Sequence, residues 1–167
     1  LTSATMAAAA TPSLDVSVDT ELALKSPVAA LRGVVSLGGD GWAEVAEGDL
    51  SAEQLSAAMT NHVFMVAGPL GKLLVRVYGG GDADAVEMFS REDEVELFVA
   101  LSSKGLGPRC LGVFRNGRVE EFLEGRTLSA AELHDPGVAQ RIARAMAATH
   151  RVDRAALGAA AAGGEEP

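Results

Sequence analysis

The sequence predicts an α+β fold, an antiparallel sheet with one crossing helix. Two β-hairpin patterns and two helix patterns follow one another in the order hairpin, helix, hairpin, helix. The strands of a hairpin are antiparallel, and a helix between two hairpins crosses the sheet that they form. This order differs from the regular strand–helix alternation of a Rossmann sheet, so that kind of nucleotide-binding fold is not expected.

The first hairpin lies near the middle of the chain. Residues 63–66 (Val-Phe-Met-Val) are a short β-prone run, and residues 68–71 (Gly-Pro-Leu-Gly) are typical of a turn. Residues 73–78 (Leu-Leu-Val-Arg-Val-Tyr) give the clearest strand pattern of the chain. Because side chains alternate along a strand, Arg76 is expected on the face opposite to the two valines.

The helix between the hairpins is predicted from Ser90 to Gly105. Ser90 can cap its first turn, with Asp93 three residues further on, and Gly105 ends it. Glu92 and Val95 are one helical turn apart, so Glu92 is expected at the edge of the apolar stripe.

The second hairpin turns at Asn116–Gly117, a strong hairpin signal. Residues 111–114 and 119–123 are its predicted strands. Asp135 and Pro136 then begin the last helix, as its cap and its first helical residue.

The patterns that precede the first hairpin are weaker. Residues 14–26 are expected to be extended or irregular. A short helix is expected from Pro27, ended by Gly38–Gly39, and residues 40–50 are acidic and rich in turn formers.

Composition excludes several classes of function. The 167 residues carry a formal net charge of −9, the opposite of what a binder of nucleic acid or of anionic membranes requires. No apolar run reaches the roughly 18 residues that span a bilayer. The single cysteine, Cys110, excludes an intrachain disulfide and favours a reducing compartment. Residues 1–13 lack the basic segment of a secretory signal, so a cytoplasmic location is expected.

Arg76 is the first candidate for chemistry. A cation in a short apolar strand must meet an anion or water. Glu92, on the following helix, is its predicted partner, and a strand cation held by a helix glutamate is how kinase folds clamp phosphates. The alternative is an arginine on an open, solvated face of the sheet, which spacing alone favours.

Several motifs in a fixed order resemble a known family. The segments LVRVYG, SREDEV, GLGPRCLGVFRNGRVEEF and GRTL, between Leu55 and His150, together resemble the N-terminal lobe of choline/ethanolamine kinases. The Thr60–Asn61 pair with LVRVYG favours ethanolamine kinases, and the alanine-rich start with GRTL resembles plant or algal members.

The resemblance implies a domain organisation. Residues 51–124 would form a protein-kinase-like N-lobe, and residues 125–154 a linker and the first helix of a C-terminal lobe. Residues 1–50 would be an alanine-rich leader and helical segment, and residues 155–167 a disordered tail.

The resemblance also implies a nucleotide site. The loop from Ser56 to Val63 would cover the phosphates of ATP, Arg76 would reach them, and Glu92 would orient Arg76. Glu121 and Phe122 would lie at the hinge, where backbone groups meet the adenine. The implied nucleotide-binding residues are therefore Ser56, Ala57, Ala58, Met59, Thr60, Asn61, Arg76, Glu92, Glu121 and Phe122.

Two departures from the family pattern bear on activity. Ala57–Ala58 stand where the family loop is rich in glycine, which permits positive φ and close backbone approach. The family's catalytic aspartate and its Mg²⁺ ligands lie beyond the helix that ends near His150. No catalytic residue and no metal ligand is therefore predicted here, and the chain alone is expected to be inactive.

Three functions remain open. The first is ATP- and Mg²⁺-dependent phosphorylation of the hydroxyl of ethanolamine or choline in phospholipid head-group synthesis, with a homodimer among the implied partners. The second is a non-catalytic truncated product that binds nucleotide weakly or associates with a full-length partner. The third is a related phosphotransferase for other hydroxylated amines, such as aminoglycosides, against which VRVYG and NGRVEEF argue.

Overall fold

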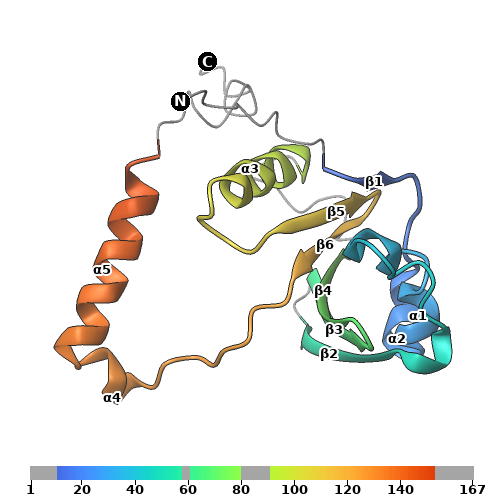
Figure 1. Ribbon diagram of the computed structural model, residues 1–167, viewed down its shortest axis with the longest axis horizontal. Coiled ribbons are helices and arrows are strands. Elements are labelled where there is room, and N and C mark those ends of the chain that lie inside the picture. The colour runs from blue at the N-terminus through green and yellow to red at the C-terminus, as the bar shows by residue number, and fades with distance from the viewer. Residues whose placement is uncertain (1–10, 58–60, 80–90, 153–167) are drawn as a thin grey trace, which may run out of the picture. The chain divides into compact units, whose positions relative to one another are not determined.

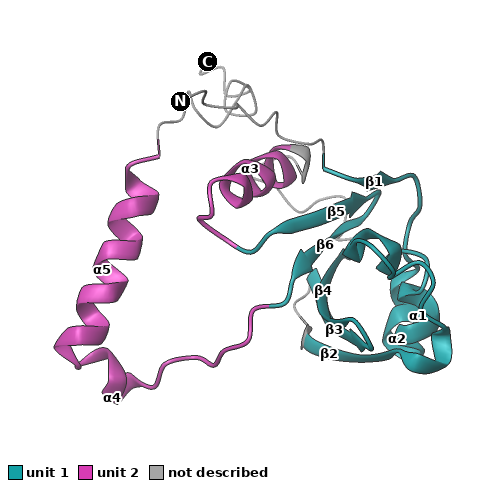
Figure 2. Ribbon diagram, in the orientation of Figure 1, with its two compact units in different colours: residues 1–88, 108–122 teal, residues 89–107, 123–167 magenta. Residues whose placement is uncertain are grey.

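The computed structural model describes residues 11–57, 61–79 and 91–152, without the side chains of residues 56, 57, 91 and 92. The chain divides into two compact units (Figure 2). We call residues 1–88 with 108–122 the sheet unit, and residues 89–107 with 123–167 the helical unit.

A six-stranded sheet organises the sheet unit (Figure 1), and with the helices it confirms the predicted α+β class. The strand order is β1-β5-β6-β4-β3-β2. Neighbours are antiparallel, except that β1 pairs with β5 in parallel. The strands are β1 (Ser13–Leu14), β2 (Ser51–Ala57), β3 (Asn61–Gly68), β4 (Gly71–Tyr78), β5 (Cys110–Phe114) and β6 (Gly117–Glu121).

Both predicted hairpins are confirmed. Strands β3 and β4 pair from Asn61–Tyr78 down to Gly68–Gly71, with the turn where the Gly-Pro-Leu-Gly run predicts it. The second turn lies one residue earlier than expected, at Arg115–Asn116, and β6 starts at Gly117 and ends two residues before the predicted end. The Asn116 side chain in this turn accepts the N–H of Val18 and donates to the C=O of Val18, each at 2.8 Å.

The predicted phosphate loop is shorter than expected. Ser56 and Ala57 belong to β2, and Asn61 to Val63 belong to β3, which leaves residues 58–60 between the strands, outside the described residues. Strand β2 carries the polar sequence SAEQLSA at the edge of the sheet. An edge strand with few apolar residues has little periodic signal, so sequence patterns do not reveal it.

Short helices precede β2 and cover one face of the sheet. They are α1 (Thr20–Lys25), α2 (Pro27–Leu31), and the 3-10 turns η1 (Val35–Gly38) and η2 (Glu47–Asp49). The expectation of an irregular segment over residues 14–26 was wrong for α1, which Asp19 caps by accepting the N–H of Leu22. The helix expected from Pro27 is confirmed but splits into α2 and η1.

One hydrophobic core joins these helices to the sheet. Val75, Val77 and Val119 on β4 and β6 are fully buried. They belong to the same cluster as Leu31 of α2 and Val35 of η1. Burial of each such side chain stabilises the fold by about 1.5–3 kcal/mol, so the segment before residue 51 is part of the folded unit.

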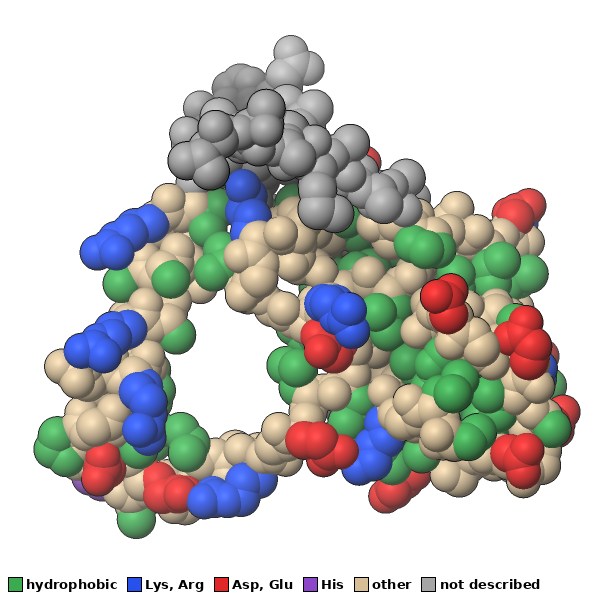
Figure 3. Space-filling view, in the orientation of Figure 1, with side chains coloured by type: hydrophobic (Ala, Val, Ile, Leu, Met, Phe, Trp, Pro, Cys, Tyr) green, Lys and Arg blue, Asp and Glu red, His purple; other side chains and the backbone are tan. Residues whose placement is uncertain are grey.

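The helical unit contains α3 (Arg91–Ser103), α4 (Ala130–Leu133) and α5 (Pro136–His150). Gly105, at φ +68°, follows α3 as predicted, and Asp135 caps α5 ahead of Pro136 as predicted. Short α4 was not predicted. Basic side chains gather along the α4–α5 segment in Figure 3, where Arg141 and Arg144 are exposed. Within the described residues, none of these helices combines the length and the apolar character needed to cross a membrane.

Gly117 provides a test of the pairing between β4 and β6. A Cβ at Gly117 would lie 2.2 Å from the carbonyl oxygen of Arg76 and 2.3 Å from the Phe114 ring. Gly117→Ala is therefore expected to lower the free energy of unfolding by about 1–3 kcal/mol. Urea unfolding of the 167-residue chain measures this loss.

Gly33→Ala is the matched control for this substitution. A Cβ at Gly33 meets nothing within 4 Å, so the substitution is expected to be neutral or stabilising by about 0.4–1 kcal/mol. Equal unfolding midpoints for the two variants would contradict the close approach of β6 to β4.

Candidate functional site

Arg76 projects from β4, in the middle of the sheet. Its neighbours Val75 and Val77 face the core and are 0% exposed, so the predicted alternation is confirmed. The Arg76 side chain lies on the other face and is 26% exposed. A cation on this face is neither fully solvated nor fully buried, and it requires a fixed partner.

Glu120 of β6 is that partner. Arg76 Nε donates to Glu120 Oε1 at 3.1 Å, and Arg118 Nε donates to the same oxygen at 2.7 Å. Arg118 Nη1 in turn donates to the Tyr78 hydroxyl, and its guanidinium carbon lies 5.8 Å from the centre of the Tyr78 ring. We call these four residues, Arg76, Tyr78, Arg118 and Glu120, the Arg76 cluster.

Strand geometry explains why these side chains meet. Arg76 is directly opposite Arg118 in the antiparallel pairing of β4 with β6, and Glu120 is opposite Leu74. Residues two apart on a strand share a face, and diagonal cross-strand neighbours are within reach of long side chains. The cluster therefore follows from the register of two strands that are far apart in sequence.

The cluster has more positive than negative charge. Two guanidiniums share one carboxylate, which leaves a formal surplus of one positive charge. Arg118 and Glu120 are 5% and 3% exposed, whereas Arg76 retains its 26% side-chain exposure. The surplus charge is thus presented at the surface by Arg76, where an anion could bind it.

The pairing of Arg76 with Glu92 remains a prediction. The side chain of Glu92 lies outside the described residues, and α3 belongs to the helical unit. Sequence reasoning missed Glu120 as a partner. The sequence pattern that could have revealed Glu120 is its spacing from Arg118: residues two apart on a strand share a face, so these opposite charges lie on the same face of the returning strand.

Adjacent Glu120 and Glu121 bind different partners, as expected because side chains alternate between the two faces of a strand. The Glu121 carboxylate accepts the backbone N–H of Arg109 at 3.2 Å and pairs with its side chain at 3.4 Å. Across the part of the chain that the structure describes, no group of three or more His, Cys, Asp or Glu side chains could hold a metal ion.

The hinge residues lie where β6 ends. The N–H of Glu121 donates to the carbonyl of Arg109 at 2.9 Å, and Glu121 is opposite Leu73 of β4. Lys72 Nζ lies 5.2 Å from the centre of the Phe122 ring. Such a cation–π contact restrains the Phe122 ring at the point where the chain leaves the sheet.

The predicted loop starts in the same row of the sheet as Arg76. Arg76 is opposite Val63, and Val63 is opposite Ser56. With about 4.8 Å between strands, the backbone of Ser56 lies roughly 10 Å from that of Arg76. Asn61 is opposite Tyr78 at the start of β3. Of the implied loop residues, Ala58, Met59 and Thr60 lie outside the described residues.

Cys110 lies beside the cluster, opposite Glu120 in the pairing of β5 with β6. Burial raises the pKa of its thiol above the usual value, and Arg118 opposes this effect only in part. A raised pKa keeps the thiol protonated, so Cys110 is not an activated nucleophile.

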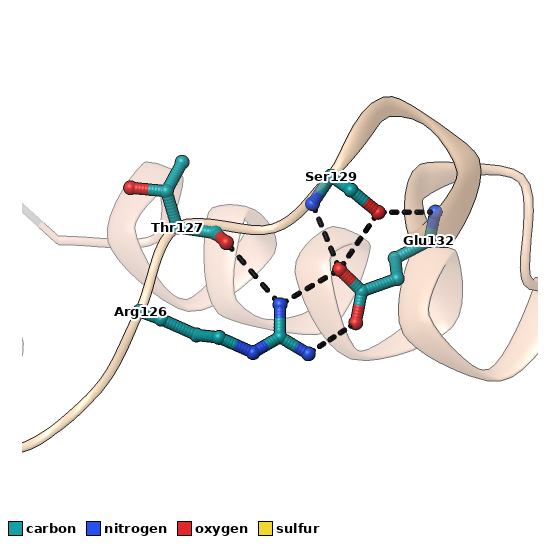
Figure 4. A network of polar contacts seen from close by, with 4 residues as sticks. All are labelled: Arg126, Thr127, Ser129 and Glu132. Carbon is teal, nitrogen blue, oxygen red and sulfur yellow. Dashed lines mark hydrogen bonds and ion pairs between the residues drawn. The ribbon is translucent and has the colours of Figure 1, made fainter.

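A second polar network orders the segment that leaves the sheet (Figure 4). Arg126 donates to both carboxylate oxygens of Glu132, at 2.6 and 2.8 Å. Ser129 and Glu132 form a capping box at the start of α4. The Arg126 guanidinium, followed by the hydrogen bonds of Ser129, lowers the pKa of Glu132 from 4.5 to about 2.

The fold of this chain resembles solved structures of kinases. Choline kinase from Cryptosporidium parvum has a similar fold, with a TM-score of 0.60 and 25% identity over 78% of this chain and 34% of that one. The family profile described as choline/ethanolamine kinase matches residues 52–162. The chain therefore belongs to the choline/ethanolamine kinase family.

Curated relatives agree with the family. "Probable choline kinase 2" of Arabidopsis thaliana is 45% identical over 120 residues, which cover 67% of this chain and 33% of that protein. "Probable ethanolamine kinase" of the same plant is 32% identical over 117 residues, covering 67% and 30%. The chain spans about a third of the length of these relatives.

The buried carboxylate of the cluster makes a clear prediction for stability. Glu120→Ala leaves Arg118 buried without its carboxylate, so the free energy of unfolding is expected to fall by about 3–5 kcal/mol. Urea unfolding measures the loss. Glu21→Ala removes an exposed ion pair with Lys25 on α1 and should cost under about 1 kcal/mol. Similar costs for the two variants would contradict a buried ion cluster.

The Glu132 network predicts a pH dependence in the helical unit. The pKa of Glu132 is lowered on folding, so its carboxylate stabilises the cap above about pH 4.5, and this stabilisation is lost as the pH falls through about 2. An NMR titration of the Glu132 carboxyl carbon should show the midpoint near 2. Arg126→Gln should raise this midpoint, whereas Arg144→Gln on α5 should not. A midpoint near 4.5 in the unaltered protein would contradict the network.

Proposed function

We propose that this chain is the nucleotide-covering part of an ATP-dependent kinase that phosphorylates the hydroxyl group of choline or ethanolamine. Membership of the family supports the reaction class. One structural observation carries the site: Arg76 is held by buried Glu120 and remains partly exposed. A fixed guanidinium suits phosphate oxygens, because it offers several N–H donors in one plane.

The charge of the Arg76 cluster fits a triphosphate. ATP would supply the phosphoryl group, and its phosphates carry the negative charge that the cluster lacks. Arg76 would bind and orient those phosphates, since its surplus charge is the exposed one. Phosphoryl transfer depends largely on such positioning and on stabilisation of charge at the phosphate oxygens.

The segment from Ser56 to Asn61 would cover the phosphates from the edge of the sheet. Its ends lie in the same rows as Arg76 and Tyr78, which supports this placement. Ala57 and Ala58 restrict positive φ, so fewer backbone N–H groups can turn toward an anion than in a glycine-rich loop. We therefore expect weaker nucleotide binding than a glycine-rich loop would give.

The hinge would meet the adenine through Phe122 rather than through the N–H of Glu121. That N–H already donates to Arg109, so it is committed to the sheet. The backbone groups that would bind the adenine are therefore those that follow Glu121, beginning at Phe122. Register separates Glu121 from Arg118, which is opposite Arg76, by three residues, or roughly 10 Å along the strand.

The rest of the reaction would use other parts of the whole kinase. We expect the amine pocket, the catalytic base and the Mg²⁺ ligands in the region that corresponds to the remaining two thirds of the relatives. The isolated chain would then be inactive. A cytoplasmic location and a homodimer remain part of this proposal.

A second candidate function is non-catalytic. In this alternative the chain is a non-catalytic product that binds nucleotide weakly or associates with a full-length kinase. The two proposals differ in one observable. Only the first predicts that the native protein, by which we mean the polypeptide as its own cells make it and not the isolated chain, consumes ATP in the presence of an amino alcohol.

The test is a phosphorylation assay of the native protein with choline and with ethanolamine. Transfer of phosphate from ATP to either amine supports the kinase, and transfer to neither overturns it. Arg76→Ala should lower kcat/KM for ATP by about 100-fold or more, because it removes a donor to the phosphates. Arg76→Lys should be milder, since it keeps the charge but loses the planar fork.

Glu21→Gln, at an exposed position of α1, is the control and should leave these constants unchanged. Near-normal turnover of Arg76→Ala would contradict the role of Arg76 even if the protein is a kinase.

A further inference from the structure

We propose that Glu120 is a positioning residue for Arg76, and that Arg118, anchored by Tyr78, keeps Glu120 from neutralising it. This inference rests on the proposed function, in which Arg76 contacts the phosphates of ATP. A glutamate inside the sheet would thus set the direction of the phosphate-binding cation.

The geometry of the bond to Arg76 favours this role. Glu120 contacts Arg76 through Nε, at 3.1 Å. A guanidinium is planar, so a bond at Nε fixes the orientation of the whole group. It does not use the N–H groups of the two terminal nitrogens. Glu120 therefore holds Arg76 at its base while the outer donors remain outside this bond.

The charges explain why a second arginine is present. With Arg76 as its sole partner, Glu120 would form a neutral pair that attracts phosphate poorly. Arg118 donates to the same oxygen at the shorter distance, 2.7 Å, and both side chains are at most 6% exposed. Glu120 is therefore shared between two guanidiniums and does not pair with Arg76 alone, so it compensates the charge of Arg76 only in part.

Tyr78 fixes Arg118 in turn. Its hydroxyl accepts a hydrogen bond from Arg118 Nη1, and the aromatic ring lies beside the guanidinium. Tyr78 shares the face of Arg76 two residues along β4 and is buried. The order of contacts is therefore Tyr78 to Arg118, Arg118 to Glu120, and Glu120 to Arg76, with three buried side chains leading to the partly exposed cation.

The competing explanation is a purely structural ion cluster that only holds β4 to β6. Both explanations predict some loss of stability when Glu120 is changed. They differ in how the change affects ATP. A positioning residue acts through Arg76, so its effect on ATP kinetics must disappear once Arg76 is absent.

The first experiment is the substitution Glu120→Gln in the native protein. Glutamine keeps an acceptor oxygen but removes the negative charge. We expect KM for ATP to rise, or kcat/KM for ATP to fall, on the order of 10–100-fold, with little change in KM for the amine. Glu21→Gln is the matched control and should change neither constant. Normal ATP kinetics in folded Glu120→Gln would overturn the proposal.

A double-mutant cycle with Arg76→Ala separates positioning from structure. If Glu120 acts through Arg76, adding Glu120→Gln to Arg76→Ala causes no further loss in kcat/KM for ATP. An additive loss would mean that Glu120 acts independently of Arg76, and the proposal would be wrong. Loss of unfolding free energy is measured in parallel for all four proteins.

Tyr78→Phe keeps the test decisive if Glu120→Gln does not fold, since it removes only one oxygen atom. We expect a smaller rise in KM for ATP, roughly 2–10-fold, which again vanishes in Arg76→Ala. An unchanged KM in Tyr78→Phe would overturn the anchoring of Arg118. Failure of Arg76→Ala to affect ATP kinetics would instead contradict the proposed function, so the two failures are distinguishable.

Discussion

The shared oxygen of Glu120 is the constraint on which the polar face of the sheet depends. A carboxylate buried to this extent must be paired, because its desolvation costs several kcal/mol. The two arginines that pair with it come from β4 and β6, which fixes the register of those strands on this face. On the opposite face the same register brings Val75 against Val119 in the core. One pairing therefore serves both the hydrophobic core and the candidate site.

Local signals predicted the elements that local interactions form. The two hairpins, the end of α3 at Gly105 and the Asp135–Pro136 start of α5 all depend on neighbouring residues. Strand β2 and helix α1 were not predicted from the sequence, because tertiary contacts stabilise them. The polar residues of β2 form a strand only because β3 offers its edge, and α1 packs Ala23 into the common core.

Only one member of the Arg76–Glu120 pair could be predicted from the sequence, for the same reason. Arg76 is noticeable as a charge within an apolar strand, so sequence alone marked it. Its partner Glu120 is 44 residues away, and the contact exists only through the pairing of β4 with β6. Reasoning along the chain looked instead to Glu92 on the next helix.

The helical cover of the sheet has a consequence for the cellular fate of the protein. Leu31 and Val35, from the segment that precedes β2, shield the valine face of β4 and β6. A translation product that began after this segment would present that face to water, as a continuous apolar sheet surface next to an unpaired edge. Such surfaces are bound by chaperones and recruit other exposed strands. Products of alternative start sites that lack this segment would therefore be retained by chaperones or would aggregate, whatever residues of the candidate site they still carried.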